Sequence, residues 1–310
     1  MRTVPLALTL WLASLPFAGS QKAPPANSQE TPGNYHIATD VDLVALDVAV
    51  IDRRGGFAGG LAKDNFEIIE DGRPQPITLF RKEDLPVTVG LIVDSSSSML
   101  PKRSETAAAA TTLVEASNPA DEVFVVNFNE KVSLGLPRSM PFTADRAALT
   151  KALYAMPAGG RTALYDALAL GLEQLNLGRH ERKSLIVFSD GGDNQSSHRL
   201  PQIMSILEQS RATLYTIGLF DERDPDRNPG VLRKLARASG GRAFLPESLK
   251  EIRAICRNIA EEIRSRYVIG YVPQAVREGE YRAVEVKVHA PGRGRLEVRT
   301  RTGFRVPRRG

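Results

Sequence analysis

The chain has 310 residues, and 42% of them are hydrophobic, so it can bury an aliphatic core as one large domain or as a large domain with a small one. The net charge is +5, with its basic excess in residues 273–310, where we expect a solvated, β-rich tail. Aromatic residues are not interleaved there as a stacking platform requires, which argues against binding of nucleic acid. The single cysteine, Cys256, excludes an intramolecular disulfide, and its helical apolar stripe predicts a buried thiol.

Residues 1–20 have the pattern of a secretory signal peptide. Arg2 gives a positive start, an apolar run covers residues 6–17, and small residues precede Gln21. An uncleaved N-terminal anchor is the alternative, and no other apolar run approaches the length of a membrane span. The pattern predicts a secreted or periplasmic protein. Residues 21–38, rich in Pro, Ser, Gln and Asn, are predicted to be a disordered linker.

Residues 39–84 form a predicted N-terminal β segment. Apolar residues on both faces of 41–51 indicate a buried strand, and 66–70 is a second strand. The Asp71-Gly72 pair predicts a turn, after which 76–81 returns as a third strand.

Strands and helices alternate through residues 85–266. The predicted strands are 87–94, 122–128, 131–134, 184–189, 212–219 and 242–245. The predicted helices are 102–116, 144–155, 163–176, 199–210, 229–238 and 248–265. This order predicts an α/β fold, a doubly wound, Rossmann-like sheet with helices on both faces.

Residues 267–306 return to a β pattern, with strands predicted at 267–272, 281–289 and 295–300. A three-stranded sheet on either flank would leave an apolar face uncovered. We therefore expect the N-terminal and C-terminal flanks to pair into one β-sandwich, with the α/β domain inserted between them.

Five oxygen-bearing side chains follow the ends of predicted strands or precede a helix. Asp94, Ser96 and Ser98 alternate directly after an apolar strand, and Asp190 ends a second one. Thr162 follows a Gly-Gly pair and precedes a helical run. Because ligands gather outside the carboxyl ends of strands in open α/β sheets, we expect the five to converge there. Oxygen ligands suit a hard divalent cation, although a serine such as Ser98 could instead cap a helix.

These three segments, in this order, resemble the metal-ion-dependent adhesion site (MIDAS) of von Willebrand factor type A (VWFA) domains. The first is Asp-Ser-Ser-Ser-Ser-Met at 94–99, the second is Gly-Gly-Arg-Thr-Ala-Leu-Tyr-Asp at 159–166, and the third is Ser-Asp-Gly at 189–191. The flanks at 64–75 and 267–273 look like those of the bacterial, acidobacterial VWFA-related subfamily, so the resemblance spans roughly residues 40–305. It implies a type A fold and an adhesive mechanism, in which a partner's carboxylate fills an open coordination position of the metal.

The residue chemistry favours Mg²⁺, with Mn²⁺ or Ca²⁺ as alternatives. The expected direct ligands are the hydroxyls of Ser96 and Ser98, joined by Thr162 or Asp190, while Asp94 binds directly or through water. We interpret Ser95, Ser97 and Ser189 as loop residues. Asp193 and Asn194 either support the site or solvate a loop, and the loop interpretation is favoured.

Three classes of function compete. The first is an extracytoplasmic, metal-dependent protein-binding module whose partner presents an Asp or Glu, and this is the one we favour. The second is a scaffold whose ion stabilises the fold. The third is a metal-dependent hydrolase, which we disfavour because the sequence has no nucleophile elbow, phosphate-binding glycine loop or Asp-x-Asp pair at a strand end. We therefore expect no catalysis.

Overall fold

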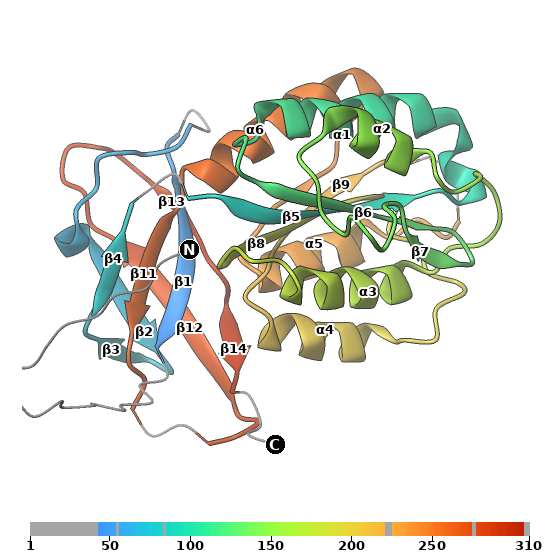
Figure 1. Ribbon diagram of the computed structural model, residues 1–310. Coiled ribbons are helices and arrows are strands. Elements are labelled where there is room, and N and C mark those ends of the chain that lie inside the picture. The colour runs from blue at the N-terminus through green and yellow to red at the C-terminus, as the bar shows by residue number, and fades with distance from the viewer. Residues whose placement is uncertain (1–42, 54–55, 83–84, 221–224, 275–276, 307–310) are drawn as a thin grey trace, which may run out of the picture. The chain divides into compact units, whose positions relative to one another are not determined.

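The computed structural model describes residues 43–53, 56–82, 85–220, 225–274 and 277–306 (Figure 1). The predicted signal peptide at 1–20 and linker at 21–38 lie outside the described residues. The described chain forms three sheets, with strand orders β10-β9-β8-β5-β6-β7, β13-β1-β11-β4 and β14-β12-β2-β3. The first belongs to an α/β unit, and the other two are built from the flanks.

The six-stranded sheet is parallel except at one edge. Its strands are β5 (Val87–Asp94), β6 (Glu122–Phe128), β7 (Val132–Leu134), β8 (Arg182–Ser189), β9 (Thr213–Gly218) and β10 (Ala243–Phe244). Only β7 runs antiparallel, against β6. All eight residues of β5 are buried, as expected for the centre of a parallel sheet covered on both faces.

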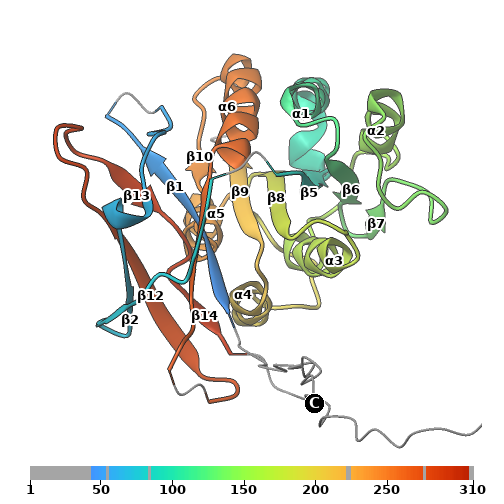
Figure 2. The same ribbon diagram turned by 60° about the vertical axis from the view of Figure 1, so that its left-hand side comes forward.

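Helices cover both faces of this sheet, with α1, α2 and α6 on one face and α3, α4 and α5 on the other (Figures 1 and 2). Their bounds are α1 Arg103–Ala116, α2 Arg146–Leu153, α3 Leu164–Asn176, α4 Leu200–Gln209, α5 Pro229–Ala238 and α6 Ile252–Arg264. Short 3₁₀ turns lie at η1 (Lys63–Asn65), η2 (Ser97–Lys102) and η3 (Leu249–Glu251). Cys256 is fully buried on α6, in the predicted apolar stripe. The predicted doubly wound α/β fold is confirmed.

The two flanks pair with each other across the inserted α/β unit. The N-terminal strands are β1 (Val44–Ile51), β2 (Phe66–Glu70), β3 (Arg73–Gln75) and β4 (Leu79–Arg81), and the C-terminal ones are β11 (Tyr267–Tyr271), β12 (Tyr281–Val288), β13 (Glu297–Arg299) and β14 (Gly303–Arg305). Strand β11 lies between β1 and β4, and β12 pairs with β2. Leu46 and Ile269 of one sheet share a core with Ile68 and Val286 of the other. This confirms the predicted β-sandwich.

Two details of the flanks differ from the sequence prediction. The Asp71-Gly72 turn leads directly into β3 at 73–75, whereas the return strand was predicted at 76–81. Pro74 is tolerated there because β3 is an edge strand. Only residues 79–81 of the predicted strand are extended as β4, and they join the other sheet. Strand β14 was not predicted, because three residues around Gly303 show no periodicity.

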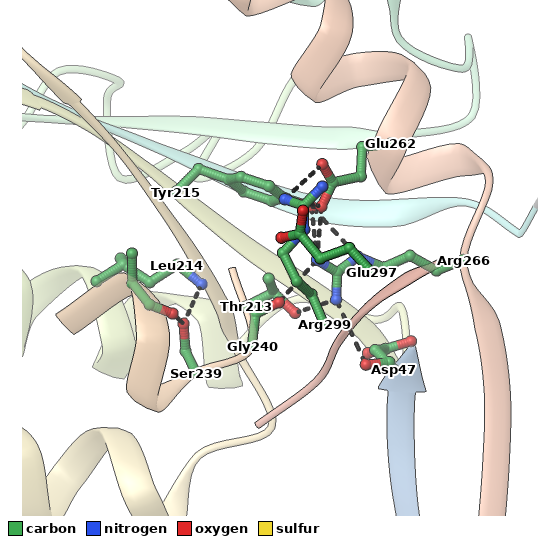
Figure 3. Close-up of polar contacts among 11 residues, drawn as sticks. Asp47, Thr213, Leu214, Tyr215, Ser239, Gly240, Glu262, Arg266, Glu297 and Arg299 are labelled. Atoms are coloured by element: carbon green, nitrogen blue, oxygen red, sulfur yellow. Dashed lines mark hydrogen bonds and ion pairs between the residues drawn. The ribbon is translucent and has the colours of Figure 1, made fainter. Parts of the chain in front are cut away.

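A buried polar network joins the end of α6 to the sandwich (Figure 3). Arg266, 3% exposed, donates to the Tyr215 hydroxyl at 2.8 Å, to Glu262 at 3.0 Å and to the Asp47 carbonyl at 3.4 Å. Arg299 of β13 forms an ion pair with the same Glu262 at 3.1 Å. The buried carboxylate is therefore shared between an arginine that follows α6 and one from the sandwich.

Candidate metal site

The site begins where two neighbouring strands end. Strands β5 and β8 pair in parallel with Val93 opposite Phe188, so their carboxyl ends reach the same edge of the sheet. Asp94 is the last residue of β5, and Asp190 follows directly after β8. Their exposed fractions are 3% and 2%, so two carboxylates are buried at one sheet edge.

Hydrogen bonds join four of the five predicted residues into one cluster. The Ser96 amide donates to Asp94 Oδ1 at 2.9 Å. The hydroxyls of Ser96 and Ser98 lie 3.2 Å apart, and Ser98 Oγ donates to Asp190 Oδ2 at 2.5 Å. The serine hydroxyls of the loop after β5 therefore reach the Asp190 carboxylate, which follows the neighbouring strand β8.

The turn after β8 holds Asp190 in place. Gly191 has a φ of +80°, a conformation that side chains rarely adopt, and a Cβ there would lie 2.4 Å from the Asn228 carbonyl. The Gly192 amide donates to Asp190 Oδ1 at 3.0 Å. The glycine pair thus allows a sharp turn that points the Gly192 amide at the carboxylate, while the Gly191 amide donates to Ser189 Oγ at 3.1 Å.

Thr162 lies in an adjoining loop. The amide of Gly159 donates to the Ser95 carbonyl at 2.8 Å, and the amide of Ser97 donates to the Gly160 carbonyl at 3.2 Å. This places the loop that carries Thr162 beside the serine loop. Among the described residues, no hydrogen bond joins the Thr162 hydroxyl to the other four. The structure therefore brings four predicted residues together and leaves Thr162, 7% exposed, at their side.

The electrostatics of the cluster fit a cation. Burial, and next the negative charge of Asp190, raise the pKa of Asp94 from 3.8 to about 7, although hydrogen bonds from Ser96 and Ser189 oppose this. A positive ion beside the two carboxylates would offset both the cost of burying the Asp94 charge and its repulsion by Asp190. No group of three or more His, Cys, Asp or Glu within the described residues could hold a metal. The cluster instead offers two carboxylates and serine hydroxyls, an all-oxygen set that fits a hard divalent cation.

Ser189 and Asn194 support the cluster, although the sequence favoured a loop role for both. Ser189 was interpreted as a loop residue, but it ends β8 and its hydroxyl donates to Asp94 Oδ2 at 2.7 Å. Its position directly before Asp190 in the sequence was the signal that could have indicated this role. Asn194, for which a loop role was favoured, accepts the Thr162 amide at 2.9 Å and donates to Asp226 at 2.7 Å. Each residue fixes the position of a predicted ligand.

A second cluster ties the loop after β8 to the start of α3. Asp166 accepts hydrogen bonds from the amides of Ser197 and His198, both at 2.9 Å, and its Oδ1 lies 2.7 Å from His198 Nδ1. Asp193 accepts from the Tyr165 amide at 3.1 Å. These bonds hold the segment that contacts Thr162, so Asp193 supports the site, contrary to the favoured loop interpretation.

Comparison with known proteins agrees with this geometry. The family model described as von Willebrand factor type A domain matches residues 89–192, a range that includes all five predicted site residues. A solved structure described as von Willebrand factor type A from Catenulispora acidiphila has a TM-score of 0.51 and 15% identity, and covers 86% of this chain and 73% of that one. Residues 89–192 thus match the von Willebrand factor type A model, and the described chain shares the fold of that solved structure.

A curated relative is similar over part of its length. It is the "Uncharacterized protein sll0103" of Synechocystis sp., 26% identical over 160 residues, which is 51% of this chain and 37% of that protein. The chain therefore matches well under half of the length of this relative.

Proposed function

We propose that this protein is a metal-dependent protein-binding module that captures an acidic side chain of a partner. The observation that carries the proposal is the hydrogen-bonded cluster of Asp94, Ser96, Ser98 and Asp190 at one sheet edge of a type A domain. Mg²⁺ is the proposed ion, because hydroxyl and carboxylate oxygens are its preferred ligands.

Each residue has a distinct proposed role. The hydroxyls of Ser96 and Ser98 are direct ligands, joined by Asp190 or Thr162, and Asp94 holds the ion directly or through water. A bound divalent cation supplies a positive attachment point for a carboxylate. Ser189 keeps Asp94 oriented by the hydrogen bond to its Oδ2.

The surface beside the cluster supports capture of a partner. Leu100, two residues after Ser98, is 53% exposed, and Ser97 and Arg161 are also exposed. An exposed leucine beside a charged site would help to exclude water when a partner docks, which strengthens the attraction between ion and carboxylate. Arg161 offers a second positive charge to an acidic partner.

The proposed division of the chain follows the sequence pattern. It comprises a signal peptide at 1–20, a linker at 21–38, β segments at 39–84 and 267–306, and the type A domain at 85–266. The predicted signal peptide supports a secreted or periplasmic location. No helix among the described residues is long and apolar enough to cross a membrane.

The test is partner capture from an extracytoplasmic extract by the full chain, in Mg²⁺ and then in EDTA. We expect capture in Mg²⁺, loss in EDTA, and loss in Asp94→Ala. Asp64→Ala, an exposed aspartate in η1, is the matched control and should capture normally. Replacing one Asp or Glu of the captured partner by its amide should abolish binding.

The competing functions predict other results. Capture that persists in EDTA or in Asp94→Ala would contradict the mechanism. A rise in melting temperature with Mg²⁺, without any metal-dependent partner, would instead indicate a fold-stabilising ion. Metal-dependent turnover of a substrate would indicate a hydrolase.

A further inference from the structure

A cavity of about 180 Å³ lies at the other edge of the α/β sheet. One wall comes from β1, β4 and β11 of the sandwich, and the other from the amino-terminal ends of β8 and β9. Asp47 and Thr213 belong to opposite walls, and Arg266 reaches both at 3.4 Å (Figure 3). Strand β8 separates the cavity from the metal site by roughly 23 Å, at about 3.3 Å per residue. The cavity is therefore distinct from the proposed metal site.

The charge of the cavity lining is positive. Four arginines line it, against the two acidic residues Asp47 and Glu181. Arg81 and Arg211 are exposed, and neither side chain forms a hydrogen bond or ion pair with a described residue. Their guanidinium groups, each a fork of donors matched to a carboxylate, are thus available to a ligand.

Main-chain oxygens of the described residues orient Arg301. Its Nε donates to the Gly303 carbonyl at 2.8 Å and its Nη2 to the Glu208 carbonyl at 2.7 Å. Both acceptors are main-chain oxygens. Burial lowers the pKa of Arg301 to about 10, and the like charge of Arg211 acts in the same direction, while the charges of Tyr281, Asp47 and Glu208 oppose this. An anion in the cavity would counter both effects.

The remaining lining restricts the kind of anion. Seven of the fourteen lining residues are apolar, among them Leu43, Leu79 and Val268. A volume of about 180 Å³ is smaller than the ~300–1,000 Å³ of pockets for drug-sized ligands. The cavity therefore fits a small molecule with a charged end and an apolar body better than a hydrated inorganic ion.

We propose that this cavity binds a small organic carboxylate, with Arg81, Arg211 and Arg301 around the carboxylate group and the apolar lining around the rest of the ligand. Such a ligand would contact the sandwich and the α/β unit together. Binding to the folded chain alone raises its free energy of unfolding. A shift in melting temperature therefore reports occupancy.

The experiment titrates the full-length chain with benzoate and with hexanoate, by calorimetry and thermal melting. The matched uncharged probes are benzamide and hexanamide. We expect saturable binding of at least one carboxylate at a single site, a concentration-dependent rise in melting temperature, and at least tenfold weaker binding of its amide, since one charge-assisted hydrogen-bond pair is lost.

Variants locate the binding. Arg81→Gln combined with Arg211→Gln should weaken carboxylate binding at least tenfold without changing the ligand-free melting temperature, because both side chains are exposed and unbonded. Arg73→Gln, an exposed arginine of β3 outside the cavity, should bind as the unaltered protein does. Equal binding of acid and amide, unchanged binding in the double variant, or no binding of either carboxylate would overturn the proposal.

Discussion

Replacing Asp94 by asparagine should make the metal-free protein less sensitive to pH. Folding raises the pKa of this carboxyl from 3.8 to about 7, so the folded state holds its proton over a range where the unfolded state has lost it. The contribution of Asp94 to stability is therefore complete below pH 3.8 and is lost as the pH rises through about 7. At 1.36 kcal/mol per pH unit, the full shift corresponds to about 4 kcal/mol of unfolding free energy.

About half of that loss, ~2 kcal/mol, falls between pH 5.5 and 8.0. Urea unfolding in EDTA at these two pH values measures it. The unaltered protein should lose about 2 kcal/mol more than Asp94→Asn, because titrating groups that do not interact with Asp94 contribute equally to both proteins and cancel in the subtraction. Restoring the ion reverses the effect, since Mg²⁺ at 100 times its dissociation constant stabilises the folded state by about 2.7 kcal/mol.

Two results would refute this reasoning. One is the same pH dependence in EDTA for both proteins, which would mean that Asp94 is not held in a buried, negatively charged setting. The other is equal stabilisation of both proteins by Mg²⁺ at pH 8.0, which would place the ion elsewhere.

Three further predictions concern the adjoining loop, the buried network and the sandwich. Thr162→Ala should reduce the free energy of partner binding more than it reduces the free energy of unfolding in EDTA. Equal reductions of the two free energies would contradict a ligand role. Arg266→Met should lower the unfolding free energy by about 3–5 kcal/mol, as expected when one partner of a buried ion pair is removed, whereas Arg257→Met on the exposed face of α6 should change it little. Deleting residues 267–310 should increase hydrogen exchange in 43–51, because β1 loses β11 and β13; unchanged exchange would show that the N-terminal flank is independent.

The fold was predictable from the sequence where the pattern is regular and strong. The apolar run of β5 and the stripe of α6 gave their element types directly, because burial on both faces and a period of 3.6 residues leave distinct patterns. The pairing of the flanks followed from the need to cover apolar faces. Strand β14 and the short return strand β3 were not predictable, since three residues carry too little periodicity.

The sequence predicted which oxygen-bearing residues form the candidate site, but not which residues hold them in place by hydrogen bonds. Asp94 and Asp190 stand at the ends of paired strands, and Ser96 and Ser98 follow in the loop and turn after β5, so the sheet topology brings the four together. Ser189 supports Asp94 through a bond across 95 residues, and such a long-range contact leaves no local pattern. The cavity at the amino-terminal ends of β8 and β9 could not be predicted either, because Arg81, Arg211 and Arg301 are far apart in the sequence and line one cavity only in the folded chain.

The most direct test of the central claim is calorimetric titration of the EDTA-treated, dialysed full-length chain with Mg²⁺ at pH 8.0, beside Asp94→Ala and the Asp64→Ala control. We predict one Mg²⁺ per chain for the unaltered protein and for Asp64→Ala, and no binding to Asp94→Ala. Equal binding by all three proteins, or no binding by any of them, would contradict a metal site at the ends of β5 and β8.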